Sequence, residues 1–305
     1  MPIPTSRTHE AATVCIENAL CTGCGLCVSV CKDFYLRLHE GKASLAAQPI
    51  FGCVGCGHCM AICPTGAISV QGRSLGPKDM FSLPPRGGAA DFAGLHALLQ
   101  RRRSVREFLP EPVAQEQIQA ILDAARTAPT GVPPSDVNVL VLDSLEKNRA
   151  FVRDFCEHLK TLRWLTAPWF LTLMRPFWGR ANHELFSNFV RPALAAFTAS
   201  MDAGRNIVTY DAPLLMYFYA SPWADPADPV VAATLAMLAG EAQGLGTCMI
   251  GSIHPLIQWG GSAARFRQRY GIVHKSREGL VVLFGRPRVH YTRGIERSFA
   301  SVTRP

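Results

Sequence analysis

The spacing of apolar and polar residues changes along the chain and divides it into two parts. Up to residue 70, short alternating runs predict strands at 12–16, 35–39, 43–45 and 67–70, separated by cysteine-rich loops. From residue 92 onward apolar residues recur at helical spacing, and apolar runs between them predict strands at 137–142, 213–220, 247–250 and 280–284. We therefore expect an α+β fold, with helices around a mixed β-sheet in the second part.

A stretch rich in Gly, Pro and Ser separates the two parts. Residues 71–91 read QGRSLGPKDMFSLPPRGGAAD, a composition typical of a linker. A length of 305 residues also favours two domains. We expect residues 1–85 to form an N-terminal domain with its linker, and residues 86–305 to form a second domain.

Eight of the eleven cysteines form two runs with the spacing C-x₂-C-x₂-C-x₃-C, and Pro64 follows the second run. Three cysteines this close can hold three corners of an iron–sulfur cubane, while the longer spacer carries the fourth to the other cluster. The motifs predict one [4Fe–4S] cluster on Cys21, Cys24, Cys27 and Cys63, and another on Cys31, Cys53, Cys56 and Cys59.

Zinc is the competing interpretation of paired cysteines, but two tight sets of four thiolates followed by proline favour clusters. The region resembles bacterial two-cluster ferredoxins. Cys15 is left over and is expected in the core of the first strand. Cys248 has no basic neighbour in the sequence and is expected to be a plain buried residue.

The formal charge of +8 does not indicate a nucleic-acid partner. Two thiolate-bound clusters and a phosphate would cancel most of it, and no basic run is interleaved with aromatic residues. The first ten residues lack the apolar segment of a secretory signal, and no run of 18 apolar residues occurs. The cysteines therefore read as metal ligands in a protein of the reducing cytoplasm.

Four further segments occur in a recognisable order. Arg102, Arg103, Ser104 and Arg106 end the first helix, and Pro129-Thr130-Gly131 end the next. A glycine-punctuated strand ends at Met249-Ile250-Gly251, and Arg286, Arg293 and Arg297 follow the last strand. In this order and at these separations, residues 92–305 resemble the nitroreductase family of FMN enzymes, some of which carry a ferredoxin domain ahead of this one.

The resemblance implies a role for each segment. Arg102, Arg103 and Ser104 would grip the FMN phosphate and ribityl chain, Arg106 would lie near the flavin N1 and O2, and Met249, Ile250 and Gly251 would present backbone near N5 and O4. Pro129, Thr130 and Gly131 would reach the flavin from a partner subunit, which implies a homodimer. Arg293 or Arg297 would contact the phosphate. The chain departs from the family pattern at Pro133, where an amide side chain is expected.

The segment from Trp164 to Trp178 holds three of the five tryptophans. Three interpretations remain open: a buried core or dimer-interface segment, a lid over the flavin that selects an apolar or aromatic substrate, and a contact with a membrane surface.

Together these features predict an FMN- and [4Fe–4S]-dependent oxidoreductase. Its clusters would relay single electrons from a soluble ferredoxin or similar donor to FMN. FMN would then reduce a small, apolar or aromatic substrate, such as a nitro compound, an activated alkene, a quinone or a halogenated compound. No acid–base pair stands out, so the chemistry would be centred on the flavin. A non-enzymatic electron carrier that passes electrons from ferredoxin to a partner protein is the alternative, and a redox sensor is a third class.

Overall fold

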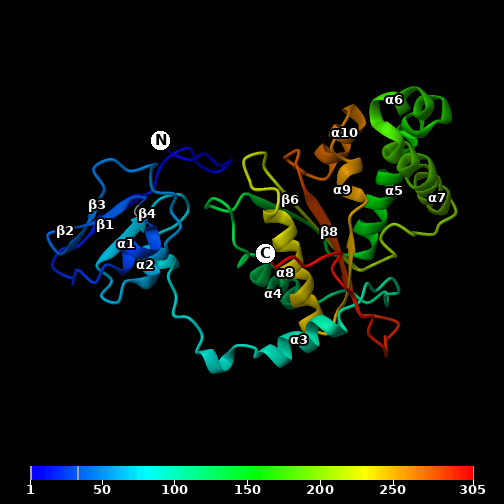
Figure 1. Cartoon of the computed structure of the whole chain (residues 1–305). Helices are drawn as coiled ribbons and strands as arrows, with labels where there is room; N and C mark the ends of the chain where they lie inside the picture. Colours follow the sequence, from blue (N-terminus) through cyan, green and yellow to red (C-terminus); the bar gives the residue numbers. More distant parts are fainter. Residues whose placement is uncertain (1, 33, 305) are drawn as a thin grey trace.

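The computed structural model describes residues 2–32 and 34–304, which form two domains joined by an extended segment (Figure 1). The small N-terminal domain contains β1 (Thr13–Ile16), α1 (Leu26–Cys31), β2 (Leu36–His39), β3 (Lys42–Leu45), α2 (His58–Ile62) and β4 (Ile68–Gln71). β1 pairs antiparallel with β4, and β2 pairs antiparallel with β3. All four strands expected in this part of the sequence are therefore confirmed.

The two cysteine motifs fold into two copies of the same loop and helix. α1 and α2 each begin directly after a glycine in the left-handed conformation, Gly25 with φ 74° and Gly57 with φ 76°. Glycine takes this conformation without the steric cost that a side chain would add. The expectation for Cys15 was wrong, because β1 turns Val14 toward the core and leaves Cys15 exposed.

The connection between the domains has little regular structure. After β4 the chain forms two short 3₁₀ turns, η1 (Pro77–Asp79) and η2 (Arg86–Gly88), and most of its residues up to 91 are exposed. Asp91 then caps the next helix by accepting a hydrogen bond of 2.7 Å from the backbone N–H of Gly94.

The C-terminal domain is built from helices around one sheet. Its elements are α3 (Phe92–Arg101), α4 (Gln115–Ala125), β5 (Val137–Leu142), α5 (Leu145–Thr161), η3 (Arg163–Thr166), α6 (Pro168–Leu185), the π-helical turn η4 (Phe186–Val190), α7 (Arg191–Asp202), β6 (Leu214–Ala220), α8 (Asp228–Ala242), β7 (Gly246–Ile250), α9 (Ile253–Leu256), α10 (Gly261–Arg269) and β8 (Gly279–Gly285). The strand order is β5-β6-β8-β7, and neighbouring strands are antiparallel. A mixed sheet was expected. The only parallel pairing to this sheet among the described residues is a single bridge between Ser104 and Thr247.

Alternating side chains of the central strand β6 face two helical layers. Leu214, Met216 and Phe218 pack toward α4 and α8, whereas Leu215 and Tyr217 pack toward α5, α9 and α10. Figure 1 shows these two groups of helices on either side of the sheet. Each fully buried side chain of this size contributes about 1.5–3 kcal/mol to folding, so the sheet carries most of the core.

α8 lies flat against the sheet and is apolar around nearly its whole circumference. Its Gly240 approaches the sheet so closely that an added Cβ would be 2.7 Å from a ring carbon of Phe284. The helix therefore fixes the distance between the residues that contact its first turn and those that contact its last turn.

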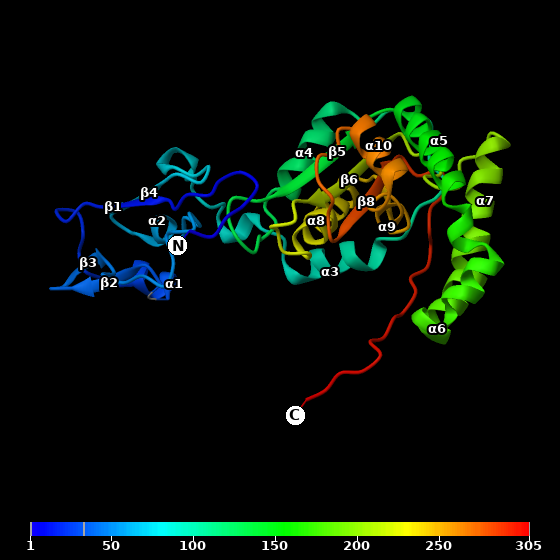
Figure 2. The ribbon, with the colours of Figure 1, turned by 90° about the horizontal axis from the view of Figure 1, so that it is seen from above.

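The aromatic segment lies at the end of the molecule away from the N-terminal domain, on η3 and α6 (Figure 2). Trp164, Phe170 and Trp178 make edge-to-face ring contacts, but Trp169 is 63% exposed and Phe177 is 79% exposed. The interpretation as a core segment of the single chain is therefore wrong. Of the helices in the described residues, none is both long and apolar enough to cross a membrane.

Candidate functional site

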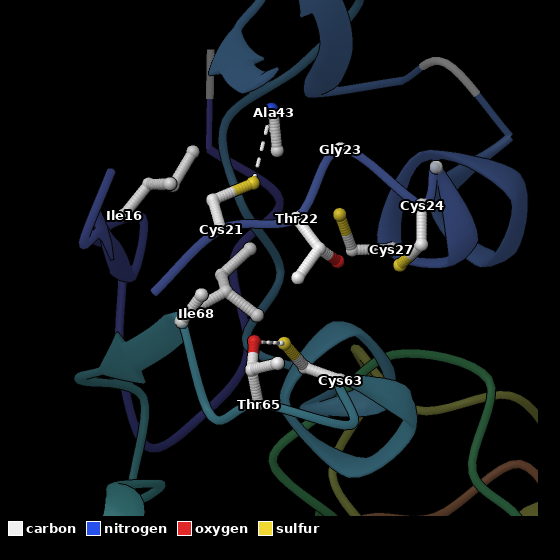
Figure 3. Close-up of a pocket in the computed structure, with 12 residues that line it drawn as sticks. Ile16, Cys21, Thr22, Gly23, Cys24, Cys27, Ala43, Cys63, Thr65 and Ile68 are labelled. Atoms are coloured by element: carbon white, nitrogen blue, oxygen red, sulfur yellow. Dashed lines mark hydrogen bonds between the residues drawn. The ribbon is translucent and has the colours of Figure 1, made fainter. Parts of the chain in front are cut away.

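The first set of cysteines surrounds one cavity in the N-terminal domain. Cys21, Cys24, Cys27 and Cys63 all line it, together with apolar side chains that include Ile16 and Ile68 (Figure 3). The loop that carries Cys21 is tightly packed, because an added Cβ on Gly23 would lie 1.9 Å from the carbonyl oxygen of Gly41. Four thiols spread around a space, with apolar neighbours, match what a four-cornered cluster requires.

Hydrogen bonds favour the thiolate form of Cys21 and Cys63 at this cavity, whereas burial raises the pKa of Cys27. The backbone N–H groups of Ala43 and Gly23 lower the pKa of Cys21, and the Ala43 N–H lies 3.5 Å from its sulfur. Burial acts to raise the pKa of Cys63, but hydrogen bonds from Thr65 and nearby backbone N–H groups outweigh it and lower this pKa. Iron is bound by thiolates, so these donors prepare the ligands and would tune a bound cluster.

The second set of cysteines is also brought together. Burial, reinforced by the nearby thiols of Cys53, Cys56 and Cys31, raises the pKa of Cys59 to about 12. Burial and the nearby thiols of Cys56 and Cys31 also raise the pKa of Cys53. Within the described part of the chain, no three Cys, His, Asp or Glu side chains converge closely enough to hold a single metal ion.

Arg102, Arg103, Ser104 and Arg106 run along the beginning of β7. The backbone N–H of Val105 donates to the carbonyl of Thr247 at 2.8 Å, and Ser104 forms a parallel bridge with the same residue. The exposed C-terminal segment returns to this place, because Tyr291 donates to the carbonyl of Ser104 at 3.4 Å. Three cationic side chains are therefore grouped beside a strand, where they can bind an anion.

Of the C-terminal arginines, Arg293 lies next to this group. Its neighbour Gly294 approaches Arg103 so closely that an added Cβ would be 2.8 Å from the guanidinium. Arg297 lies further along the same exposed segment. Arg286 points elsewhere, since it forms an ion pair of 3.0 Å with Glu111.

Cys248 lies within this group of residues. It is 2% exposed, which agrees with the expected buried position. Burial raises the pKa of its thiol, although Arg106, Ser104 and Arg102 act in the opposite direction. The fold thus supplies the basic neighbours that the sequence lacks, but the thiol stays protonated.

Pro129, Thr130 and Gly131 lie at the other end of α8. The N–H of Gly131 donates to the carboxylate of Asp228 at 3.1 Å, at the first turn of the helix. Arg102 instead acts on Glu241 near the last turn, where burial raises the pKa of the Glu241 carboxyl and Thr247 and Arg102 oppose that shift. At 1.5 Å per residue, the two helix ends are about 20 Å apart. One chain therefore does not bring Pro129–Gly131 and Arg102–Arg106 together.

Comparisons with known proteins agree with both halves of this arrangement. Residues 99–286 match the model of the nitroreductase family, and residues 11–68 match the model of a 4Fe–4S dicluster domain. The chain belongs to the nitroreductase family. The predicted resemblance, the α+β fold with an N-terminal ferredoxin-type domain, and two 4Fe–4S clusters are thereby confirmed.

Solved nitroreductases with bound FMN are similar to this chain at low identity. One from Desulfitobacterium hafniense is 19% identical, with a TM-score of 0.48 over 68% of this chain and 97% of that one. One from Bacteroides fragilis is 15% identical, with a TM-score of 0.48 over 69% of this chain and 98% of that one. A comparison with curated proteins found no match.

The nitroreductase domain also holds a cavity of about 610 Å³ beyond the end of β7. Its wall includes Gly251, His254 and Gln258, and Lys275 lies over the ring of Trp259 at 3.4 Å from the ring centre. These residues were not singled out from the sequence. No sequence signal pairs His254 with Gln258, because α9 ends at Leu256 and Gln258 lies in the bend that follows it.

A hydrogen-bonded network closes the floor of this cavity. The hydroxyl of Tyr217 and Nδ1 of His254 are 2.8 Å apart, and Gln258 donates to the same hydroxyl at 3.3 Å. Burial lowers the pKa of His254, so its imidazole is neutral at physiological pH. The volume lies within the usual range for small-molecule pockets.

Proposed function

We propose that the chain is an iron–sulfur flavoprotein oxidoreductase that reduces a small, apolar or aromatic substrate. When bound, FMN supplies the two-electron chemistry, and the [4Fe–4S] clusters supply electrons singly from a soluble ferredoxin or similar donor. Two donor molecules are each oxidised by one electron, and solvent protons complete the reduction of one substrate molecule. The observation that carries the proposal is a cavity walled by four cysteines in the same chain as a cationic group along β7.

The cysteines divide between the two clusters according to their surroundings. We assign the first cluster to the set that lines the cavity: Cys21, Cys24, Cys27 and Cys63. We assign the second to the set grouped around Cys59: Cys31, Cys53, Cys56 and Cys59. The crossover of Cys31 and Cys63 follows from the C-x₃-C spacing and from the electrostatic coupling within each set.

The residues along β7 are suited to hold FMN. Arg102, Arg103 and Ser104 would bind its phosphate and ribityl chain, with Arg293 as the favoured C-terminal contact because its neighbour touches Arg103. Arg106 would offset the negative charge of reduced flavin and thereby raise its potential. The backbone of Met249, Ile250 and Gly251 continues the same strand and would face the ring.

The separation along α8 supports a homodimer. If Pro129, Thr130 and Gly131 contact FMN, they must do so in a second copy of the chain, because in their own chain they lie about 20 Å from Arg102. The exposed aromatic side chains of α6, Trp169 and Phe177, offer apolar area that a second copy would cover or that would cap its flavin.

The cavity beyond Gly251 supports an aromatic substrate. Its wall carries Trp259, one face of which Lys275 covers, and the buried polar atoms of His254 and Gln258 are already hydrogen-bonded to protein. Arg277 and Glu278 also line the wall, so an aromatic molecule with a polar group, such as a nitro compound, fits it better than a purely apolar one. We also propose residues 1–85 and 86–305 as the two domains. We propose the cytoplasm as the compartment, because none of the eleven cysteines, all of which the structure describes, forms a disulfide and eight are suited to bind clusters.

Anaerobic purification with iron, sulfide and flavin analysis tests the cofactors. We expect two clusters and one FMN per chain, and turnover of nitroaromatic, quinone, activated-alkene or halogenated substrates with reduced ferredoxin as the donor. A chain that folds with zinc in place of iron, or without flavin, would contradict the proposal. A loaded chain that transfers electrons only to a protein acceptor would make it an electron carrier instead.

A further inference from the structure

Two stretches of the N-terminal domain contact one short segment of the nitroreductase domain. In residues 2–32 and 34–304, the hydrogen bonds that join the domains come from Ser6, Arg7 and Arg73. All of them are accepted within residues 133–136, between Pro129–Gly131 and β5. Figure 1 shows the N-terminal stretch reaching toward the second domain.

Arg73 joins the second cysteine loop directly to this segment. Its Nε donates to the carbonyl of Val54 at 2.9 Å and to the carbonyl of Pro133 at 3.1 Å. Its Nη2 donates to the same Pro133 carbonyl at 2.6 Å, and Nη1 donates to the carbonyl of Glu10 at 2.6 Å. Val54 lies between Cys53 and Cys56, so one guanidinium spans from the cysteine loop to the other domain.

The charge of Arg73 is not balanced by an ion pair among the described residues. The side chain is buried, its acceptors are neutral carbonyl groups, and the charges that act on it are Cys53 and Asp136. The Asp136 carboxylate is already bonded by Ser6 and Ser221. The ionised Asp136 therefore offsets the buried cation only from a distance, and an anionic cluster on Cys53 would add a second negative charge beside the guanidinium.

The first cysteine site has different surroundings. Its cavity is lined only by residues between Ile16 and Ile68 of the N-terminal domain. In the described residues, no hydrogen bond joins this wall to the nitroreductase domain. The cation nearest Cys21 is Lys42, an exposed side chain that donates to the Cys21 carbonyl.

We infer that Arg73 makes the site of Cys31, Cys53, Cys56 and Cys59 the one that exchanges electrons with the nitroreductase domain, while the site lined by Cys21 receives them from the external donor. This inference rests on the proposed function and adds to it the order of the two sites. With clusters bound, each electron lost by the donor would be gained at the site of Cys21 and passed to the site of Cys53, and two such transfers would supply one substrate reduction.

Arg73 acts as a positioning residue in two ways. It holds the Cys53–Cys56 loop against Pro133, and its buried charge stabilises the more negative, reduced form of an adjacent cluster. A buried charge is screened less by salt and water than the exposed Lys42. A cluster bound next to the nitroreductase domain would therefore have the higher potential of the two, which would favour transfer toward that domain.

The test uses the full chain loaded with both clusters and FMN. The variants are Arg73→Gln, which removes the charge, and Arg73→Lys, which keeps it but loses the fork of donors; Lys42→Gln is the matched control. Midpoint potentials are measured by EPR-monitored titration, and flavin reduction is followed by stopped flow with a reduced plant-type ferredoxin as the donor.

We expect Arg73→Gln to lower the midpoint of one cluster and to slow flavin reduction at least tenfold. Arg73→Lys should restore that midpoint while flavin reduction stays slow, and Lys42→Gln should leave the cluster affected by Arg73 unchanged. Asp136→Asn weakens the Ser6 contact and removes a negative charge near Arg73, so it should slow flavin reduction while lowering neither midpoint.

Arg73→Lys and Asp136→Asn keep the test decisive if Arg73→Gln fails to fold. Wild-type midpoints and rates in a folded Arg73→Gln chain would overturn the inference, as would wild-type rates in both Arg73→Lys and Asp136→Asn. A wild-type chain that binds no clusters or no FMN would instead overturn the proposed function, so the two failures are distinguishable.

Discussion

The hydroxyl of Ser6 donates to the buried carboxylate of Asp136 at 2.7 Å, across a sequence separation of 130 residues. The backbone N–H of Ser6 donates to the same carboxylate at 2.8 Å, and the hydroxyl of Ser221 donates at 2.6 Å. Burial acts to raise the pKa of Asp136, but these hydrogen bonds outweigh it and lower the pKa. The N-terminal stretch is thus attached to the nitroreductase domain by an ionised, fully bonded group.

Asp136→Ala should release this stretch. Hydrogen bonds to a charged group contribute about 1.5–3 kcal/mol each, so we expect a loss of that order in domain attachment. Faster amide exchange in residues 5–8 would report it. Asp123→Ala, which removes an exposed ion pair with Arg126, is the control and should change stability by less than about 0.5 kcal/mol.

Cys24→Ser should remove one cluster and leave the other. Cys24 is an exposed cysteine that lines the first cavity, whereas Cys15 is an exposed cysteine outside both motifs. Iron analysis of anaerobic preparations should therefore give about half the wild-type iron for Cys24→Ser and the full amount for Cys15→Ser. Equal iron loss in the two variants would contradict the ligand assignment.

Arg103→Ala should weaken FMN binding by at least about tenfold, because one charge-assisted hydrogen bond to phosphate is lost. Arg286→Ala removes an equally cationic side chain that pairs with Glu111, and FMN binding should be unchanged. Fluorescence titration of flavin-free chains measures both affinities. The assignment of Arg103 fails if the two variants weaken binding alike.

Mixed dimers test whether the flavin site is shared between chains. Arg103→Ala damages the half-site along β7, and Thr130→Trp obstructs the half-site at the start of α8. Each variant alone carries two defective sites, whereas a mixed dimer carries one site with both defects and one intact site. Mixing should therefore restore up to half of the wild-type FMN bound per mixed dimer, and no recovery would place both segments in separate functions.

The free energy of unfolding should decrease as the pH is lowered, because the buried His254 resists protonation in the folded chain. Burial lowers the pKa of His254 below its ordinary value of about 6.5, so the unfolded chain binds this proton more readily than the folded chain. The stabilisation is complete above the ordinary pKa and decreases as pH falls toward the lowered folded pKa. Thermal unfolding between pH 8 and pH 5.5 should show a shallower decline for His254→Gln than for wild type, with the exposed His96→Gln as the control.

Local patterns were enough to predict the strands and the cysteine sets, because both depend on short-range spacing. Buried residues such as Val14 in β1 and Ile68 in β4 alternate with more exposed neighbours, and the cysteines recur in C-x₂-C units. Both patterns can be recognised within a few residues. Cys15 shows the limit of this reasoning, since a one-residue change in register decides which side of a strand is buried.

The contacts of Arg73 could not be predicted from the sequence, because they join residues 60 positions apart through a backbone carbonyl. A carbonyl has no residue-specific signature, so Pro133 stood out only by the absence of an amide side chain. The neighbours of Cys248 were missed for a related reason: Arg106 reaches it through the Ser104–Thr247 bridge, a pairing of distant segments.

The uniform apolar surface of α8 has a consequence for how this chain can change. One residue inserted in the middle of the helix would rotate its first turn by about 100° relative to its last. Asp228 would then turn away from Gly131 while Glu241 kept its bond to Thr247. We therefore expect α8 to keep its length. Insertions and deletions should instead accumulate in the connection at residues 71–91 and in the aromatic segment.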